Sequence, residues 1–165
     1  MVARLRKRGK AGIVAFIVVL ALGGSAILAY AITAPSGGVY PVIAAKVSSS
    51  ATIGGPAKTA LTKCSVGITR KSTGSTKGRV TVTEAKGTAK KGHVFKSTGI
   101  TLLDVNPTKT LAHVQADGTL DKVAGFSADV VVTTSPATCA ITISQANTVQ
   151  FAASGPAVKG KIKIK

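Results

Sequence analysis

From residue 39 to residue 165, apolar and polar side chains alternate over short stretches, and no stretch carries the apolar stripe of an amphipathic helix. The apolar members are mainly Val, Ile, Leu and Ala, with many Thr residues between them. β-Branched residues in alternation are typical of strands with one buried and one exposed face. The pattern predicts ten short strands: 39–47, 60–69, 79–84, 94–105, 110–116, 119–123, 127–134, 138–144, 148–153 and 158–165.

Turn-forming residues separate these segments. Gly, Pro, Asn, Asp and Ser cluster at 54–56, 72–78, 87–92, 106–107, 117–118 and 154–156. Asp117-Gly118 lies between two alternating segments, and this dipeptide favours the tight turn of a β-hairpin. Short strands with regularly spaced turns predict an all-β domain over residues 39–165, either an antiparallel β-sandwich or a jelly roll.

The last predicted strand has the clearest pattern. Lys159, Lys161, Lys163 and Lys165 alternate with Gly160, Ile162 and Ile164. This alternation predicts a strand with one lysine face and one apolar face on the surface of a sheet. Two interpretations stay open: a basic binding stripe, or a solvated face whose lysines discourage edge-to-edge pairing.

The N-terminal part of the sequence predicts a membrane segment. Residues 11–34 contain no charged side chain over 24 residues, and a helix of about 20 apolar residues spans a bilayer. The leader 1–10 carries five basic residues and no acid, which predicts a cytoplasmic N-terminus and export of the remainder. Residues 35–38, Pro-Ser-Gly-Gly, form a short linker before the β domain.

The fate of this segment has two interpretations. Ala29-Tyr30-Ala31 has the form of a signal-peptidase site, and cleavage there would leave Ile32 as the N-terminus of a secreted domain. An apolar run of this length favours a retained single-pass anchor, which gives the protein the lipid bilayer as a partner. In an anchor, the small residues Ala21, Ser25 and Ala29 would lie on one stripe and could pack against a second membrane helix.

The net charge of the chain is +17. The leader carries five of the 22 Lys and Arg residues, so the exported part has 17 basic residues against five acidic ones. Lysines without aromatic neighbours suit diffuse attraction to anionic polymers of a cell envelope better than specific nucleic-acid recognition, and the chain has no Trp. The densest stretch supplies the candidate polyanion contacts: Lys58, Lys63, Arg70, Lys71, Lys77, Arg79, Lys86, Lys90, Lys91 and Lys96.

The two cysteines, Cys64 and Cys139, both fall in predicted strands of the exported part. An even number of cysteines outside the cytoplasm predicts a structural disulfide. Neither histidine, His93 or His113, has ligand spacing to a cysteine, so no metal site is expected.

No arrangement of residues indicates catalysis or a cofactor. The segment 87–93 has the glycine spacing of a phosphate-binding loop but carries His93 where such a loop needs Lys. The five acidic residues are scattered, and no nucleophile elbow is present. We therefore expect a protein that is not an enzyme and that needs no cofactor.

These observations favour a non-enzymatic structural or surface protein, a membrane-anchored basic β domain used for assembly or adhesion at a cell envelope. In an oligomer or filament, the apolar segment 39–47 could pair with the sheet of a neighbouring copy. A membrane-associated structural protein of a virion fits the same features. A secreted binding or inhibitor module would result if the signal peptide were cleaved.

Overall fold

The computed structural model describes residues 43–54, 61–84 and 92–165. This part of the chain contains eight β-strands and no helix. The strands are β1 (Ala45–Gly54), β2 (Leu61–Arg70), β3 (Thr76–Glu84), β4 (Val94–Val105), β5 (Leu111–Leu120), β6 (Val123–Thr134), β7 (Ala137–Gln145) and β8 (Thr148–Ile164). The segment for which the sequence predicts a membrane helix, residues 11–34, lies outside the described residues.

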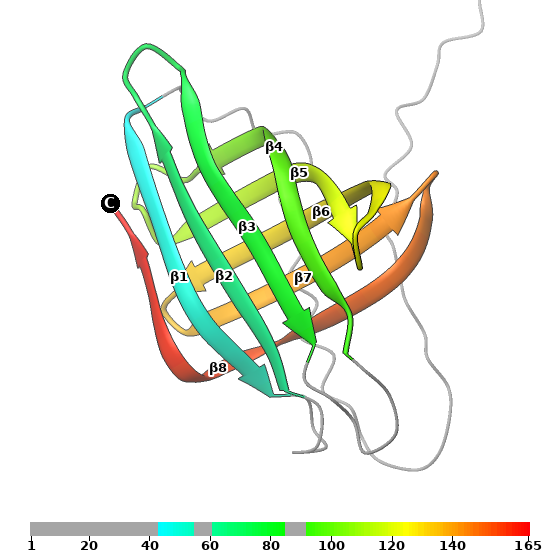
Figure 1. The fold of residues 1–165 in the computed structure, drawn as a ribbon. Helices are drawn as coiled ribbons and strands as arrows, with labels where there is room; N and C mark the ends of the chain where they lie inside the picture. The colour runs from blue at the N-terminus through cyan, green and yellow to red at the C-terminus, as the bar shows by residue number, and fades with distance from the viewer. Residues whose placement is uncertain (1–42, 55–60, 85–91) are drawn as a thin grey trace, which may run out of the picture.

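The strands form one closed antiparallel barrel in which each strand pairs with the next along the chain and β8 pairs with β1 (Figure 1). The prediction of a β-sandwich or jelly roll is therefore wrong. Closure rests on the β1–β8 ladder, which runs from Val47–Ile164 to Ile53–Ala157. At its end, Lys46 and Lys165 exchange two backbone hydrogen bonds of 2.8 and 2.9 Å. A sandwich would leave these two strands unpaired.

The barrel is flattened rather than round. Figure 1 shows β1, β2, β3 and the first half of β4 crossing in front of β5 to β7, with β4 bending into the rear layer and β8 curving from the rear layer to the front one. The sequence treats β8 as two strands because Ser154-Gly155-Pro156 interrupts the pattern, but these residues lie within one continuous strand. There β8 passes from β7, its partner as far as Pro156, to β1, its partner from Ala157 onward. A strand that changes partners in this way forms a corner of the barrel.

The predicted hairpin at Asp117-Gly118 is also wrong, because both residues lie inside β5. The turn comes later, at Asp121 and Lys122, whose positive φ values of 51° and 73° are typical of a type I′ turn. Gly118 serves close packing instead. A Cβ atom there would lie 2.3 Å from the carbonyl oxygen of Lys96 and 2.7 Å from the ring of Phe95.

The interior of the barrel is filled by the apolar members of the alternating pattern. Phe95 is the largest of the fully buried side chains, and most of the others are Val or Ile. Ile162 and Ile164 of β8 pack against this core, as their alternation with lysine predicts. The core is built around Val47, Ile53, Val66, Ile68, Val80, Val82, Phe95, Val105, Val114, Val130, Ile141 and Ile143.

The contact between β3 and β4 is the weakest part of the wall. Its ladder has only three residue pairs, from Thr81–Lys96 to Thr83–Val94. A buried arginine on β2 connects the layers further along. Arg70 donates one hydrogen bond to the carbonyl of Ile43, at 2.9 Å, and one to the carbonyl of Leu103 on β4.

The first strand begins later than the sequence predicts, at Ala45 instead of residue 39. Ala45 and Val47 pair with β2, and Val47 also pairs with β8. This part of the 39–47 segment is therefore enclosed in the barrel wall and has no free edge for a neighbouring molecule. Residues 39–42 lie outside the described residues.

Candidate functional site: the lysine face

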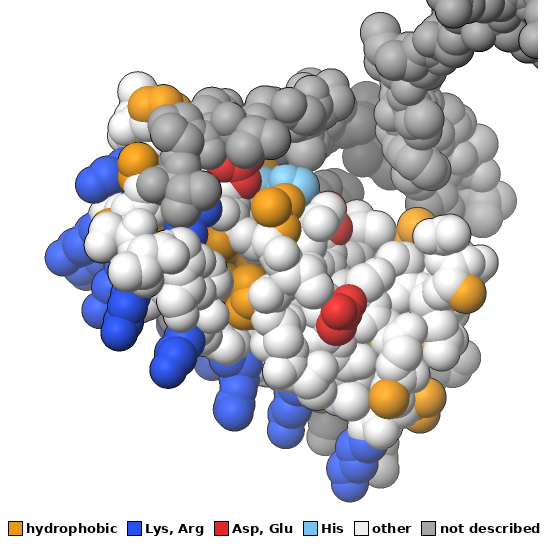
Figure 2. Space-filling view, turned by 90° about the horizontal axis from the view of Figure 1, so that it is seen from above, with side chains coloured by type: hydrophobic (Ala, Val, Ile, Leu, Met, Phe, Trp, Pro, Cys, Tyr) orange, Lys and Arg blue, Asp and Glu red, His pale blue; other side chains and the backbone are white. Residues whose placement is uncertain are grey.

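One side of the barrel carries most of its positive charge. The outward positions of β8, β1, β2 and β3, with the adjoining start of β4, hold nine exposed cations. We call this surface the lysine face; its members are Lys46, Lys63, Lys77, Arg79, Lys96, Lys159, Lys161, Lys163 and Lys165. Lys and Arg side chains project along the left and lower margins of Figure 2, away from the acidic groups.

The strand register arranges these cations in rows across the sheet. Lys163 pairs with Ser48, which pairs with Gly67, which pairs with Arg79. The row on one side of it runs from Lys165 through Lys46 and Thr69 to Lys77. Two more rows lie on the other side of the first. One runs from Lys161 through Ser50, Ser65 and Thr81 to Lys96, and the next runs from Lys159 through Thr52 to Lys63. Each row thus has a cation from β8, or Lys165 directly after it, and at least one more from another strand.

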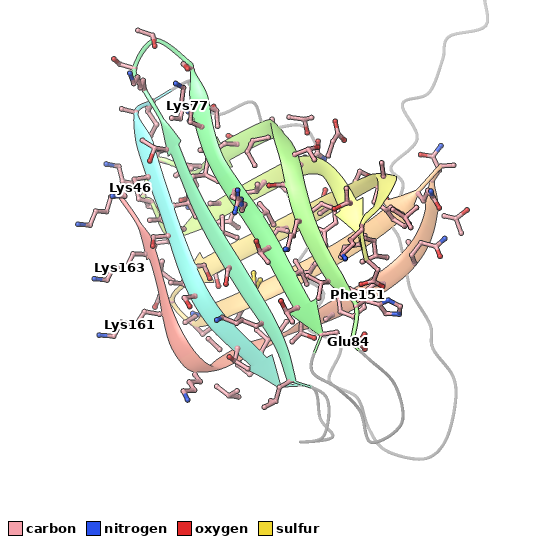
Figure 3. All side chains as sticks on the ribbon, viewed as in Figure 1. Lys46, Lys77, Glu84, Phe151, Lys161 and Lys163 are labelled. Atoms are coloured by element: carbon pink, nitrogen blue, oxygen red, sulfur yellow. The ribbon has the colours of Figure 1, made fainter. Side chains whose placement is uncertain are left out.

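Small polar residues occupy the middle of the rows. We call them the hydroxyl strip: Ser48, Ser50 and Thr52 of β1 with Ser65 and Thr69 of β2. Lys46 of β1 and Lys63 of β2 lie at the two ends of this strip, and the other cations flank it on both sides. Figure 3 shows Lys161 and Lys163 pointing outward from β8, beside Lys46 of β1.

The cations of the lysine face have no acidic partners in the described part of the chain. Both salt bridges found there join a histidine to an aspartate, and neither involves Lys or Arg. Four of the five acidic residues lie on β4, β5, β6 or the turn between β5 and β6. The fifth, Glu84, ends β3, far along the strand from Lys77 (Figure 3). The positive field of this face is therefore uncompensated.

The residues that the sequence predicts to contact a polyanion do not all lie on the lysine face. Lys63, Lys77, Arg79 and Lys96 belong to the lysine face, and Lys71 is exposed in the turn that follows β2. Lys58, Lys86, Lys90 and Lys91 lie outside the described residues, as do Ala21, Ser25 and Ala29 of the predicted membrane segment.

Arg70 does not belong on the contact surface. Its residue is only 7% exposed, and its guanidinium lies inside the barrel on the carbonyls of Ile43 and Leu103. The strand alternation could have revealed this, because Arg70 has the same parity as the buried Val66 and Ile68.

The C-terminal lysines and the dense basic stretch belong to one surface. Along the sequence Lys159 to Lys165 form a stripe separate from that stretch, but the β1–β8 and β1–β2 ladders merge the two. No signal in a single sequence reports that the first and last strands are neighbours.

The two cysteines meet inside the barrel. Cys64 of β2 and Cys139 of β7 are both fully buried free thiols, and their side chains are neighbours. The side-chain interaction with Cys64 and burial together raise the pKa of Cys139 far above its ordinary value, so this thiol stays protonated. A disulfide between them remains a prediction.

Each histidine lies beside an aspartate. His113 on β5 contacts Asp129 on β6 at 2.9 Å, and Gln115 donates to the same carboxylate oxygen at 3.1 Å. The hydrogen bond to Asp129 raises the pKa of His113, against the opposing effect of burial. Burial by itself would raise the pKa of Asp129, but the hydrogen bonds from His113 and Gln115 outweigh it and lower that pKa.

The second pair stabilises a turn. His93 contacts Asp121 at 2.6 Å, and the other oxygen of that carboxylate accepts the backbone N–H of Val94 at 2.8 Å. The hydrogen bond with His93, followed by that with Val94, lowers the pKa of Asp121. Within the described residues, neither histidine is hydrogen-bonded to a Ser, Thr or Cys side chain that could act as a nucleophile.

Other features of the described residues give little basis for a small-molecule or metal site. An open hollow of about 280 Å³ is bordered by β4, β5 and β6, and Asp117 is its one titratable group. Across residues 43–54, 61–84 and 92–165, no three metal-ligating side chains come together. Nor does this part of the chain contain a helix with the length and hydropathy needed to cross a membrane.

The comparisons with known proteins add no further assignment. No protein-family model matches the chain, and no curated protein or solved structure shows significant similarity to it.

Proposed function

We propose that the chain is a non-enzymatic surface protein of a cell envelope. In this proposal residues 11–34 anchor it in the membrane, and the barrel attaches through its lysine face to an anionic component of the envelope during assembly or adhesion. The observation that supports the proposal is the lysine face itself: nine exposed cations on one side of the barrel, with no salt bridge among the described residues.

The physical basis is additive electrostatic attraction. An isolated exposed lysine contributes little, but a basic residue close to an anionic surface contributes about 1 kcal/mol. Several cations on one face act together and also steer the approach of an anionic partner. Such attraction weakens as salt is added, because the screening length is only about 8 Å at physiological ionic strength.

Charge reversal tests the attachment. The full chain, held in nanodiscs of neutral lipid, should sediment together with purified wall fragments and with anionic envelope vesicles. The variant Lys161→Glu/Lys163→Glu should no longer do so. The matched control is Lys109→Glu/Lys122→Glu, which makes the same charge change at two exposed turn lysines away from β8. Equal losses of binding in the two variants would mean that binding depends only on net charge, and would refute a role for the lysine face.

The intact mass of the native protein tests the anchor separately. A mass that includes residues 1–31 supports a membrane-tethered protein. A mass equal to that of residues 32–165 would contradict the membrane tether and would indicate a secreted basic domain.

A further inference from the structure

We propose that the partner of the lysine face is a linear polymer with phosphate groups along its backbone, and that it lies along β1 over the hydroxyl strip. This inference rests on the proposed function and specifies its ligand. It goes beyond net charge because it depends on how the cations and hydroxyls are placed relative to one another.

The first argument is the shape of the charged surface. Lys159 to Lys165 form a line along one side of the hydroxyl strip that is about 20 Å long, since a strand rises about 3.3 Å per residue. Lys77 and Arg79 of β3 and Lys96 of β4 lie on the other side of the strip. Adjacent strands are about 4.8 Å apart, so flexible lysine side chains on both sides can reach one extended chain that runs parallel to β1.

The second argument is the chemistry between the lines of cations. Ser48 and Ser50 are exposed, and no side-chain hydrogen bond joins either hydroxyl to another described residue. Hydroxyl groups of this kind donate to phosphate oxygens, while the lysines supply charge. The strip therefore has unused donors where the backbone of the polymer would lie.

The third argument is the type of cation, which indicates how the polymer is held. Eight of the nine cations are Lys and only Arg79 is Arg. The guanidinium of Arg binds carboxylate and phosphate alike in a fixed two-pronged geometry, whereas Lys binds phosphate as a point charge on a flexible stem. The predominance of Lys therefore suits a flexible chain held by charge along its length, and the polyglutamate probe separates carboxylate from phosphate.

The fourth argument separates a polymer from a bilayer surface. Peripheral attachment to a bilayer usually combines basic residues with large apolar or aromatic side chains that enter the lipid. Over the hydroxyl strip the outward positions of β1 and β2 carry Ser, Thr and Gly, with Lys46 and Lys63 at its ends. The exposed Leu61 and Val158 lie beyond the strip, around Gly54. A barrel wall is also convex, so a flat membrane would meet fewer of the cations than a flexible chain that both lines can enclose.

The test uses the full chain in nanodiscs of neutral lipid and four probes: long-chain polyphosphate, tripolyphosphate, polyglutamate and vesicles of phosphatidylglycerol. We expect long-chain polyphosphate to bind most tightly per charge, with affinity rising with chain length until the polymer covers about 20 Å of strand. Lys161→Gln/Lys163→Gln should weaken this binding about tenfold at low salt and reduce its salt dependence. Lys109→Gln/Lys122→Gln should change it by less than about twofold.

A second variant tests the position of the polymer. Ser48→Ala/Ser50→Ala leaves every charge in place and should weaken long-chain polyphosphate about threefold, because two donors to phosphate are lost. Unchanged binding in this variant would contradict the placement over the hydroxyl strip.

The outcomes distinguish this inference from the proposed function. Tighter binding to vesicles or to polyglutamate than to polyphosphate, still dependent on Lys161 and Lys163, would refute the phosphate polymer and leave attachment through the lysine face intact. Binding to none of the four probes, or equal effects in the two lysine double variants, would refute both.

Discussion

Cys64 and Cys139 contact each other inside the barrel although their strands, β2 and β7, are not hydrogen-bonded neighbours. Two strands, β1 and β8, separate them along the wall, so a covalent bond between these thiols would cross the interior and join the front layer to the rear one. The residues are 75 positions apart in the chain. The pair is the one place where a single bond could fix the closure of the barrel from within.

In an oxidising compartment we expect the two thiols to form a disulfide. Both thiols are fully buried in the folded barrel, so exchange with oxidised glutathione takes place while the chain folds and the thiols are accessible. The exchange transfers two electrons and two protons from the thiol pair to the glutathione disulfide, which becomes two thiols. Closing a loop of this length should stabilise the barrel by about 4 kcal/mol. Intact mass and urea unfolding, each with and without reductant, measure the effect. Cys64→Ala/Cys139→Ala is the control that should not respond; a native protein equally indifferent to reductant would contradict the disulfide.

Replacing Gly160 by Ala should disrupt the seam between β8 and β1. Gly160 has a φ of +96°, and a Cβ atom there would lie 1.8 Å from the carbonyl oxygen of Ser50. We expect Gly160→Ala to lower the free energy of unfolding by about 3 kcal/mol. Gly67→Ala is the control, because a Cβ at that strand position meets nothing within 4 Å. Equal stability of the two variants would show that the seam tolerates the added methyl group.

Replacing Arg70 by Met should loosen the contact between the layers. The change removes the donors to the carbonyls of Ile43 and Leu103 and leaves both acceptors without these partners. We expect a loss of about 2 kcal/mol in urea unfolding, although the removal of a buried charge offsets part of the cost. Lys71→Met changes the same charge one residue later, in an exposed turn, and should have little effect. A fully stable Arg70→Met variant would mean that Arg70 does not hold β4 in place.

The pair of His113 and Asp129 should make stability depend on pH. The pKa of His113 is raised in the folded barrel by its hydrogen bond to Asp129, with burial opposing and the charges of Asp129 and Asp104 supporting the shift. A raised pKa stabilises the fold fully below the unfolded value of about 6.5, and the effect is lost as pH rises through the folded pKa. We expect the difference between the native protein and His113→Gln to shrink over that range, by about 0.5 kcal/mol because Asp129 is partly exposed.

Urea titrations at intervals from pH 5 to pH 8 measure this difference. Asp129→Asn should remove the same pH dependence, since the acceptor for His113 loses its charge. A constant difference between native protein and His113→Gln across these pH values would rule out the linkage.

The local alternation of residues was sufficient to predict most of the strands. The strand predicted at Val94–Val105 has the same bounds as β4. The lysines from Lys159 to Lys163 lie on the opposite face of β8 from Ile162 and Ile164, as their alternation predicts. The turn signals were less reliable. Asp117-Gly118 resembles a hairpin turn, but in the barrel Gly118 is selected by the close approach of Lys96 and Phe95, a contact between different strands.

The candidate site could be predicted only in part. The excess of lysine was visible in composition, and alternation identified the solvent-facing residues of β8. The surface that they form with Lys46, Lys63 and Arg79 depends on ladders between strands far apart in the chain. Arg70 was assigned to the surface because of its charge, yet its carbonyl partners, more than 25 residues away on either side, keep it inside.

By itself the sequence determined the all-β class. Side chains that alternate between apolar and polar give a strand one face to bury and one face to expose, and this holds in any sheet. It also determined which residues point inward on most strands. Only the tertiary structure decided between a sandwich and a closed barrel, since both bury the same alternating residues. They differ in pairing: a sandwich divides its strands between two sheets, whereas here every strand pairs with the next and β8 pairs with β1. That pairing joins the ends of the domain, so its free energy comes from contacts that no local pattern contains. The same pairing assembles the lysine face and brings Cys64 to Cys139.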